Sequence, residues 1–173
     1  MTELTSLAAR VRQNLNDPDE KRYSEGMLTC AIRQALELID LQLPQTAVTD
    51  VIVEIGGRDQ PLNDLTGCLY LVRLVLSAAA SGSRELEPET HFSYQMNAGI
   101  PTLHFFGEYI PQRGAAFQVH YAAANTIEGL DDSVSTSLPA ICEPALVNGA
   151  VSQAYSLRAA SLMETYGSRP EEA

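Results

Sequence analysis

The chain has 173 residues, of which 45% are hydrophobic, 19% charged and 6% aromatic, and it has no tryptophan. This length fits one domain with at most an inserted lobe and excludes a TIM barrel, and the apolar fraction is that of a globular protein rather than a disordered one. Twenty-two acidic residues against eleven basic ones give a net charge of −11, which repels nucleic-acid phosphates and argues against a sequence-reading DNA or RNA binder.

Cysteine spacing and the N-terminus bear on the cellular compartment. The three cysteines lie far apart without a CxxC pair, so we interpret them as small buried apolar residues in a reducing compartment: Cys30, Cys68 and Cys142. The first fifteen residues contain Glu3 and no continuous apolar run, which predicts no signal peptide. The longest apolar stretch, residues 68–76, is far shorter than the roughly 20 residues that cross a bilayer. We therefore expect a soluble protein without membrane contact.

Residues 1–44 show the spacing of a helical hairpin. The apolar stripe of the first helix recurs every three or four residues, at Leu4, Leu7, Ala8, Val11 and Leu15. Pro18 follows in a turn-forming segment, Ser24 is a suitable N-cap for the second helix, and Pro44 ends that helix. The stripe of the second helix consists of Leu28, Ile32, Leu36, Ile39 and Leu43. The sequence therefore predicts two packed helices.

Residues 48–123 change to the alternation that is typical of strands. Strands are expected at residues 51–55, 68–76, 91–97, 102–106 and 116–123, although the second of these has a modest β-branched content. Prolines and glycines separate the later runs. Residues 81–83 and 85–89 are expected to form an exposed acidic turn. The middle of the chain is thus predicted to be a small antiparallel β lobe.

Residues 137–166 are predicted to form a long final helix, entered at Ser137 and Pro139. Its apolar side chains cover most of the circumference, so we expect burial on several sides, against the hairpin and the sheet or partly against a neighbouring subunit. Residues 167–173 are polar and are expected to form a flexible tail. The predicted fold is α+β and a single domain over residues 1–173, with the β lobe inserted between the helical hairpin and the C-terminal helix.

The histidines are the first candidates for a chemical site. His104 and His120 lie on neighbouring predicted strands with Glu108 nearby, and two histidines with an acid can hold a metal. The chain lacks HxH and HExxH spacing, which favours histidines that lie on the sheet without binding a metal. It also lacks a nucleophile elbow and a phosphate loop. The acidic clusters at 17–20, 85–89 and 131–132 are interpreted as solvated loop charge. We predict no catalytic residue, no cofactor, no metal site and no enzymatic activity.

Short motifs follow one another in a distinctive order along residues 5–165. The N-terminal motifs are Arg10-Val11-Arg12, Asp17, Tyr23-Ser24-Glu25, Ala31-Ile32-Arg33-Gln34-Ala35-Leu36 and Leu43-Pro44. The later motifs are Pro101-Thr102-Leu103-His104-Phe105, Pro111, Gly114, Val119-His120-Tyr121, Ile127-Glu128-Gly129-Leu130-Asp131, Thr136-Ser137-Leu138-Pro139 and the run from Glu143 to Ala150. This order resembles that of the head-to-tail adaptor proteins of tailed phages. The β middle is larger than in the purely helical adaptors.

The resemblance implies a structural protein of the virion neck, between capsid and tail, that is made in the host cytoplasm. Such adaptors form a ring, typically dodecameric, beneath the portal protein and present a surface to the tail or the next neck protein. DNA passes through the ring without being read, and an acidic lumen would let it slide. An alanine-rich helix would allow neighbours to pack closely. The surface expected to contact a neighbour or the portal comprises Ala150, Ala154, Leu157, Arg158, Leu162, Tyr166 and Arg169.

Two alternatives remain at this point. The first is another ring protein of the neck, such as a tail-completion or head-closure protein, although such proteins are mostly β and the long helical segments count against them. The second is a small α+β ligand-binding protein or metal-dependent enzyme whose site consists of His104, His120 and Glu108. Alanine substitutions at these three positions would abolish the function of such an enzyme but leave a ring protein intact.

Overall fold

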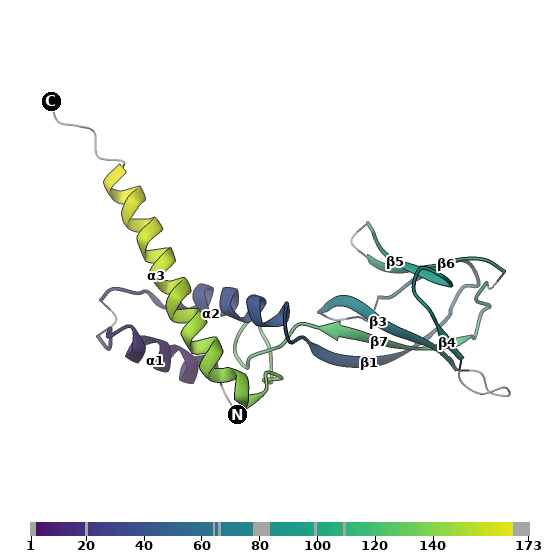
Figure 1. Cartoon of the computed structure of the whole chain (residues 1–173), viewed down its shortest axis with the longest axis horizontal. Helices are drawn as coiled ribbons and strands as arrows, with labels where there is room; N and C mark the ends of the chain where they lie inside the picture. Colours follow the sequence, from purple (N-terminus) through teal and green to yellow (C-terminus); the bar gives the residue numbers. More distant parts are fainter. Residues whose placement is uncertain are drawn as a thin grey trace. The chain divides into compact units, whose positions relative to one another are not determined.

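The computed structural model describes residues 3–19, 21–63, 65, 67–77, 84–98, 100–108 and 110–167, with the backbone alone for 77, 166 and 167. The chain forms two compact units (Figure 1). The helical unit comprises Met1–Pro44 and Asn125–Ala173, and the β unit comprises Gln45–Ala124. Within the described residues, no helix has the length and apolar character needed to span a bilayer. The mixed α+β fold, with N-terminal helices, antiparallel strands and a long C-terminal helix, is confirmed.

The described residues of the helical unit form three α-helices and one short 3-10 helix. They are α1 (Leu4–Asn14), α2 (Glu25–Asp40), η1 (Ala140–Cys142) and α3 (Glu143–Gly167). The predicted cap of α2 is confirmed, because the Ser24 side chain accepts a hydrogen bond from the Met27 N–H. The first apolar stripe is buried as predicted, with Leu7 and Val11 fully enclosed. Periodicity therefore located both N-terminal helices to within a few residues.

The core of the helical unit lies where α1, α2 and α3 meet. Leu28, Ile32 and Leu146 are completely buried there. Gly149 allows α3 to approach α2 closely, because a Cβ at this position would lie only 3.2 Å from the Cβ of Ala35. A larger side chain would overpack this crossing. Gly149 of α3 thus serves a contact inside the subunit.

A buried polar clamp ties the C-terminal end of α2 to the segment that follows the β unit. The Asp40 carboxylate accepts hydrogen bonds from the Asn125 backbone N–H at 2.9 Å and from its side-chain amide at 2.7 Å. The same amide donates to the Leu43 carbonyl at 3.0 Å. Asp40 and Asn125 are both about 5% exposed, and this burial is tolerated because their polar atoms are paired.

The turn between α1 and α2 is organised around Asp17, which was expected to be solvated. This prediction is wrong: Asp17 is 4% exposed, and its carboxylate accepts the backbone N–H groups of Lys21, Arg22 and Tyr23. Burial raises the pKa of Asp17, but these hydrogen bonds and the nearby Arg12 charge outweigh it and hold the pKa below the ordinary value of 3.8. The ionised carboxylate therefore stabilises the turn.

Replacing Asp17 with asparagine should lower the melting temperature by several degrees at pH 7. Because the pKa is lowered in the folded state, the carboxylate contributes stability above pH 3.8, and this contribution disappears as the pH falls through the folded-state value. The difference in melting temperature between the wild type and the variant should therefore become smaller below about pH 4. Circular dichroism melts at pH 7, 5 and 3 measure this difference. Asp19→Asn, at an exposed position in the same turn, should show no such difference. A difference in melting temperature that stays constant with pH would contradict the stabilising role of the ionised Asp17 carboxylate.

The described strands of the β unit form two antiparallel sheets. Its strands are β1 (Gln45–Ile52), β2 (Asp59–Pro61), β3 (Cys68–Ser77), β4 (Arg84–Leu86), β5 (Phe92–Asn97), β6 (Ile100–Phe105) and β7 (Ala116–Ala123). The four-stranded sheet has the order β1-β7-β3-β4, and the three-stranded sheet has the order β2-β6-β5. The two sheets share one apolar core, with Phe92, Phe105 and Phe117 at most 1% exposed.

Three strand assignments differ from the sequence-based expectation. The first strand was placed at 51–55 but runs from Gln45 to Ile52, because its pairing with β7 selects the earlier residues. Short β2 carries no apolar alternation and was missed. The acidic segment 85–89 was expected to be a turn, but Arg84–Leu86 pairs with β3 and buries Leu86. Tertiary pairing decided all three positions.

Candidate assembly surface on the last helix

The last helix starts later than predicted. Segment 137–142 is irregular except for η1, and the Ser137 hydroxyl accepts the Thr126 backbone N–H instead of capping a helix. Helix α3 begins at Glu143, whose carboxylate forms an ion pair with Arg10 of α1 at 2.6 Å. An acid in the first turn also suits the helix dipole.

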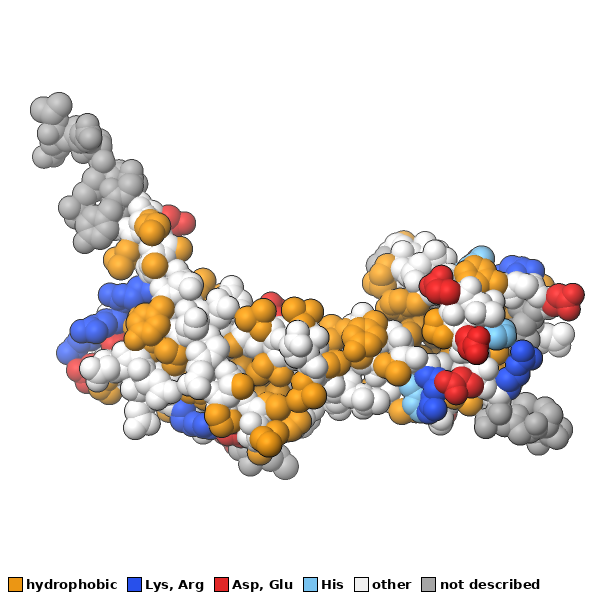
Figure 2. Space-filling view, in the orientation of Figure 1, with side chains coloured by type: hydrophobic (Ala, Val, Ile, Leu, Met, Phe, Trp, Pro, Cys, Tyr) orange, Lys and Arg blue, Asp and Glu red, His pale blue; other side chains and the backbone are white. Residues whose placement is uncertain are grey.

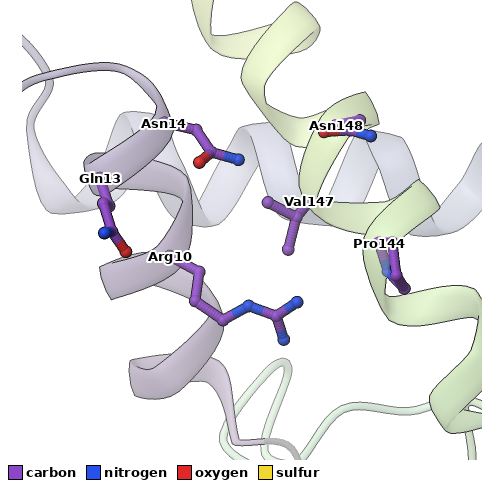
Figure 3. A pocket seen from close by; sticks show the side chains of 6 residues that line it. All are labelled: Arg10, Gln13, Asn14, Pro144, Val147 and Asn148. Atoms are coloured by element: carbon purple, nitrogen blue, oxygen red, sulfur yellow. The ribbon is translucent and has the colours of Figure 1, made fainter.

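A polar hollow of about 210 Å³ lies between α1 and the first turns of α3 (Figure 3). Side chains from both helices line it, and the Arg10 guanidinium extends from α1 toward α3. The lining residues are Arg10, Gln13, Asn14, Pro144, Val147 and Asn148. The lining side chains supply amides and one paired guanidinium, and none of them is a nucleophile or a general base.

The middle of α3 belongs to the subunit's own core. Ala150 and Ala154 are completely buried there, together with Leu146 and Val147. The expectation that these two alanines face a neighbour is therefore corrected: their methyl groups fill the space against α1 and α2. Leu157 is half-buried and packs on the same core.

Arg158 is also engaged within the subunit. Its guanidinium donates a hydrogen bond to the Arg22 carbonyl and lies 5.2 Å from the centre of the Tyr23 ring. Tyr155 meets the same ring edge-on, at 6.2 Å between ring centres. The side chains of Tyr155 and Arg158 thus fasten α3 to the turn between α1 and α2.

Residues 159–165 of α3, which we term the helix extension, continue past this anchor (Figure 1). Every side chain of the extension is exposed. Leu162 is 43% and Met163 74% exposed, and hydrophobic side chains are visible on this part of the surface (Figure 2). The backbone of Tyr166 continues the helix without a described side chain, and Arg169 lies outside the described residues.

The structure thus divides the predicted surface along the helix. Of the expected contact residues, only Leu162 is both described and freely exposed, while Met163 and Tyr155 are exposed residues that sequence reasoning missed. Met163 could have been found, because it directly follows Leu162 in a helix without a continuous polar face. Nothing in the sequence distinguished the buried alanines from exposed ones.

The histidine site proposed as an alternative does not form. His104 lies on β6 in the three-stranded sheet, whereas His120 lies on β7 in the four-stranded sheet. His104 Nδ1 lies 2.6 Å from Asp59 Oδ1, and His120 contacts Gln118 and Arg73 instead. Glu108 is exposed in the loop after β6. The described part of the chain contains no group of three or more histidine, cysteine or acidic side chains arranged to hold a metal.

Comparison with solved structures gives a likeness at low sequence identity. No protein-family model and no curated protein matches the chain. The chain is similar to a chain from the neck of an empty GTA particle determined with C6 symmetry, at 18% identity and a TM-score of 0.38, covering 87% of this chain and 77% of that one. The function of the chain has to be inferred from its own side chains.

Proposed function

We propose that this chain is a structural head-to-tail adaptor of a phage-like virion. Copies of the chain form a ring, with twelve subunits as the expected number, between the portal protein and the tail or next neck protein. DNA passes through the ring without sequence-specific contacts, consistent with a chain of net charge −11. The chain acts by binding other proteins and carries out no reaction.

The helix extension is the observation that carries this proposal. A helix with hydrophobic side chains on several faces normally lies inside a protein, because burial of a leucine or methionine side chain contributes about 1.5–3 kcal/mol. Residues 159–165 leave such side chains exposed after the anchor at Arg158. A surface of this kind fits a contact with another subunit. The order of motifs that resembles the adaptors supports the same assignment.

A different neck ring protein remains the second candidate, because it would use an exposed apolar helix in the same way. The GTA neck chain is a structure from the same part of a particle. Binding to the portal protein distinguishes an adaptor from a ring protein that sits further along the neck.

Native mass spectrometry of the chain, alone and mixed with the portal protein from the same genome, tests the proposal. We expect a ring or a stoichiometric complex on the portal. A ring that forms without any affinity for the portal would favour the second candidate. A stable monomer that ignores the portal would overturn both.

A further inference from the structure

Strand β1 forms an open edge of the four-stranded sheet. Among the described strands it pairs with β7 alone, over eight residues in regular register. Natural edge strands are usually short, bulged, or protected by lysine or proline, because a row of free N–H and C=O groups invites another strand. β1 contains none of these devices, and Asp50 is its only charged residue.

The opposite side of the same sheet has a second open edge. β4 covers β3 only at Leu74–Leu76, so the segment from Cys68 to Arg73 has no described strand on its other side. Its pairing with β7 is irregular, with register shifts between Cys68 and Tyr70 and between Leu71 and Arg73. Leu69, Tyr70 and Val72 in this segment are 44–52% exposed. β7 lies between the two open strands (Figure 1). One sheet therefore offers two different edges, as a head-to-tail contact between copies requires.

A groove lies beside β1 and can receive side chains from an added strand. The hollow measures about 480 Å³ and is lined by residues 50–52, 54–56 and 59–63. It opens between β1 and β2, which are edge strands of their respective sheets. Ile52 and Ile55 on its rim are 67% and 80% exposed.

Opposite charges mark the two edges. Asp50 projects from the outer face of β1, where its carboxylate has a long contact of 3.5 Å to Gln118. Arg73 lies on the same outer face of the sheet, in register with His120 and Val48, and its side chain is 45% exposed. Its contact with Glu85 is 3.9 Å long. An arginine on one edge and an aspartate on the other are complementary across a contact between copies.

We propose that β1 of one copy pairs with residues 68–73 of β3 in the next copy, with Asp50 beside Arg73 of the partner subunit. The four-stranded sheet then continues from subunit to subunit, and main-chain hydrogen bonds supply most of the contact. This inference rests on the proposed ring and names the surface that closes it.

A charge swap tests the pairing. Asp50→Arg and Arg73→Asp should each raise the protein concentration needed for half-maximal assembly, with the portal protein present, at least tenfold. The double variant carrying both substitutions should restore assembly toward the wild-type value, which mass photometry can measure. Asp19→Arg makes the same charge change on the helical unit and should leave assembly unchanged. All three substituted side chains are exposed, so all four variants should keep the wild-type melting temperature within about 2 °C.

The outcomes separate this inference from the proposed function. If the wild type and both single variants assemble equally well, the ring stands and the β1–β3 contact is wrong. A double variant that assembles no better than the single variants also contradicts the direct pairing of Asp50 with Arg73. If the wild type forms neither a ring nor a portal complex, the proposed function and the inference fall together.

Discussion

Replacing Phe105 with alanine should lower the free energy of unfolding of the β unit by about 3–5 kcal/mol. Phe105 is completely buried between the two sheets. Its ring stacks on Phe117 with 5.3 Å between ring centres and contacts Phe92 at 6.3 Å. Truncation removes these contacts and leaves a cavity that strands from both sheets line, and a two-sheet core cannot collapse easily around such a hole.

Hydrogen exchange followed by mass spectrometry can measure this effect separately in the two units. Peptides of β6 and β7 should exchange much faster in the variant, while peptides of α2 and α3 should change little, because each unit has its own hydrophobic core. Phe106→Ala provides the matched control: Phe106 is half-buried and contacts His104, so its loss should cost about 1 kcal/mol or less. Equal acceleration in helical and β peptides would show that the units unfold together.

The sequence predicted the fold well where one face of an element is buried. Leu7, Val11, Leu28 and Ile32 recur at helical spacing, and all of them are enclosed in the core. The alternation in residues 116–123 likewise predicted β7, which buries Phe117, Val119 and Tyr121. Periodicity records burial on one face, and it is informative whenever an element has a single buried face.

Short strands and buried carboxylates were beyond such reasoning. β2 and β4 have three residues each and exist because neighbouring strands offer them partners. Asp17 resembles any loop aspartate in the sequence, and only the folded turn brings three backbone N–H groups to it. Both features depend on contacts between segments distant in sequence or on the folded path of a turn, which local sequence patterns do not record.

The contact surface that the sequence predicts on α3 stays a prediction, and it includes two residues, Ala150 and Ala154, that are completely buried inside the subunit. An all-round apolar composition indicated that α3 has more than one partner. It did not show where the helix changes from its own core to an exposed surface. That change follows the contacts of Tyr155 and Arg158 with Tyr23, which link positions more than 130 residues apart in the sequence. A single sequence carries no sign of this pairing.

Two aspartate substitutions on α3 should therefore have opposite consequences. Ala154→Asp places a carboxylate at a completely buried position without a partner, and it should destabilise the helical unit by at least about 3 kcal/mol. A loss of this size lowers the melting temperature by roughly 6–12 °C in a chain of this length. Leu162→Asp changes an exposed side chain on the helix extension and should alter stability by about 0.5 kcal/mol or less.

Leu162→Asp should impair assembly although it leaves the stability of the chain nearly unchanged. If the helix extension binds a neighbour or the portal protein, a charge in that contact should reduce the bound fraction at least tenfold while the circular dichroism melt stays at the wild-type temperature. Ser161→Asp, at the preceding exposed and polar position, controls for the added charge and should reduce binding less. A Leu162→Asp variant that assembles like the wild type would remove the helix extension from the contact surface. Leu162 lies outside the folded core, so an effect of its substitution on assembly cannot be explained by a loss of stability. A substitution at the buried Ala154 would not separate these two explanations.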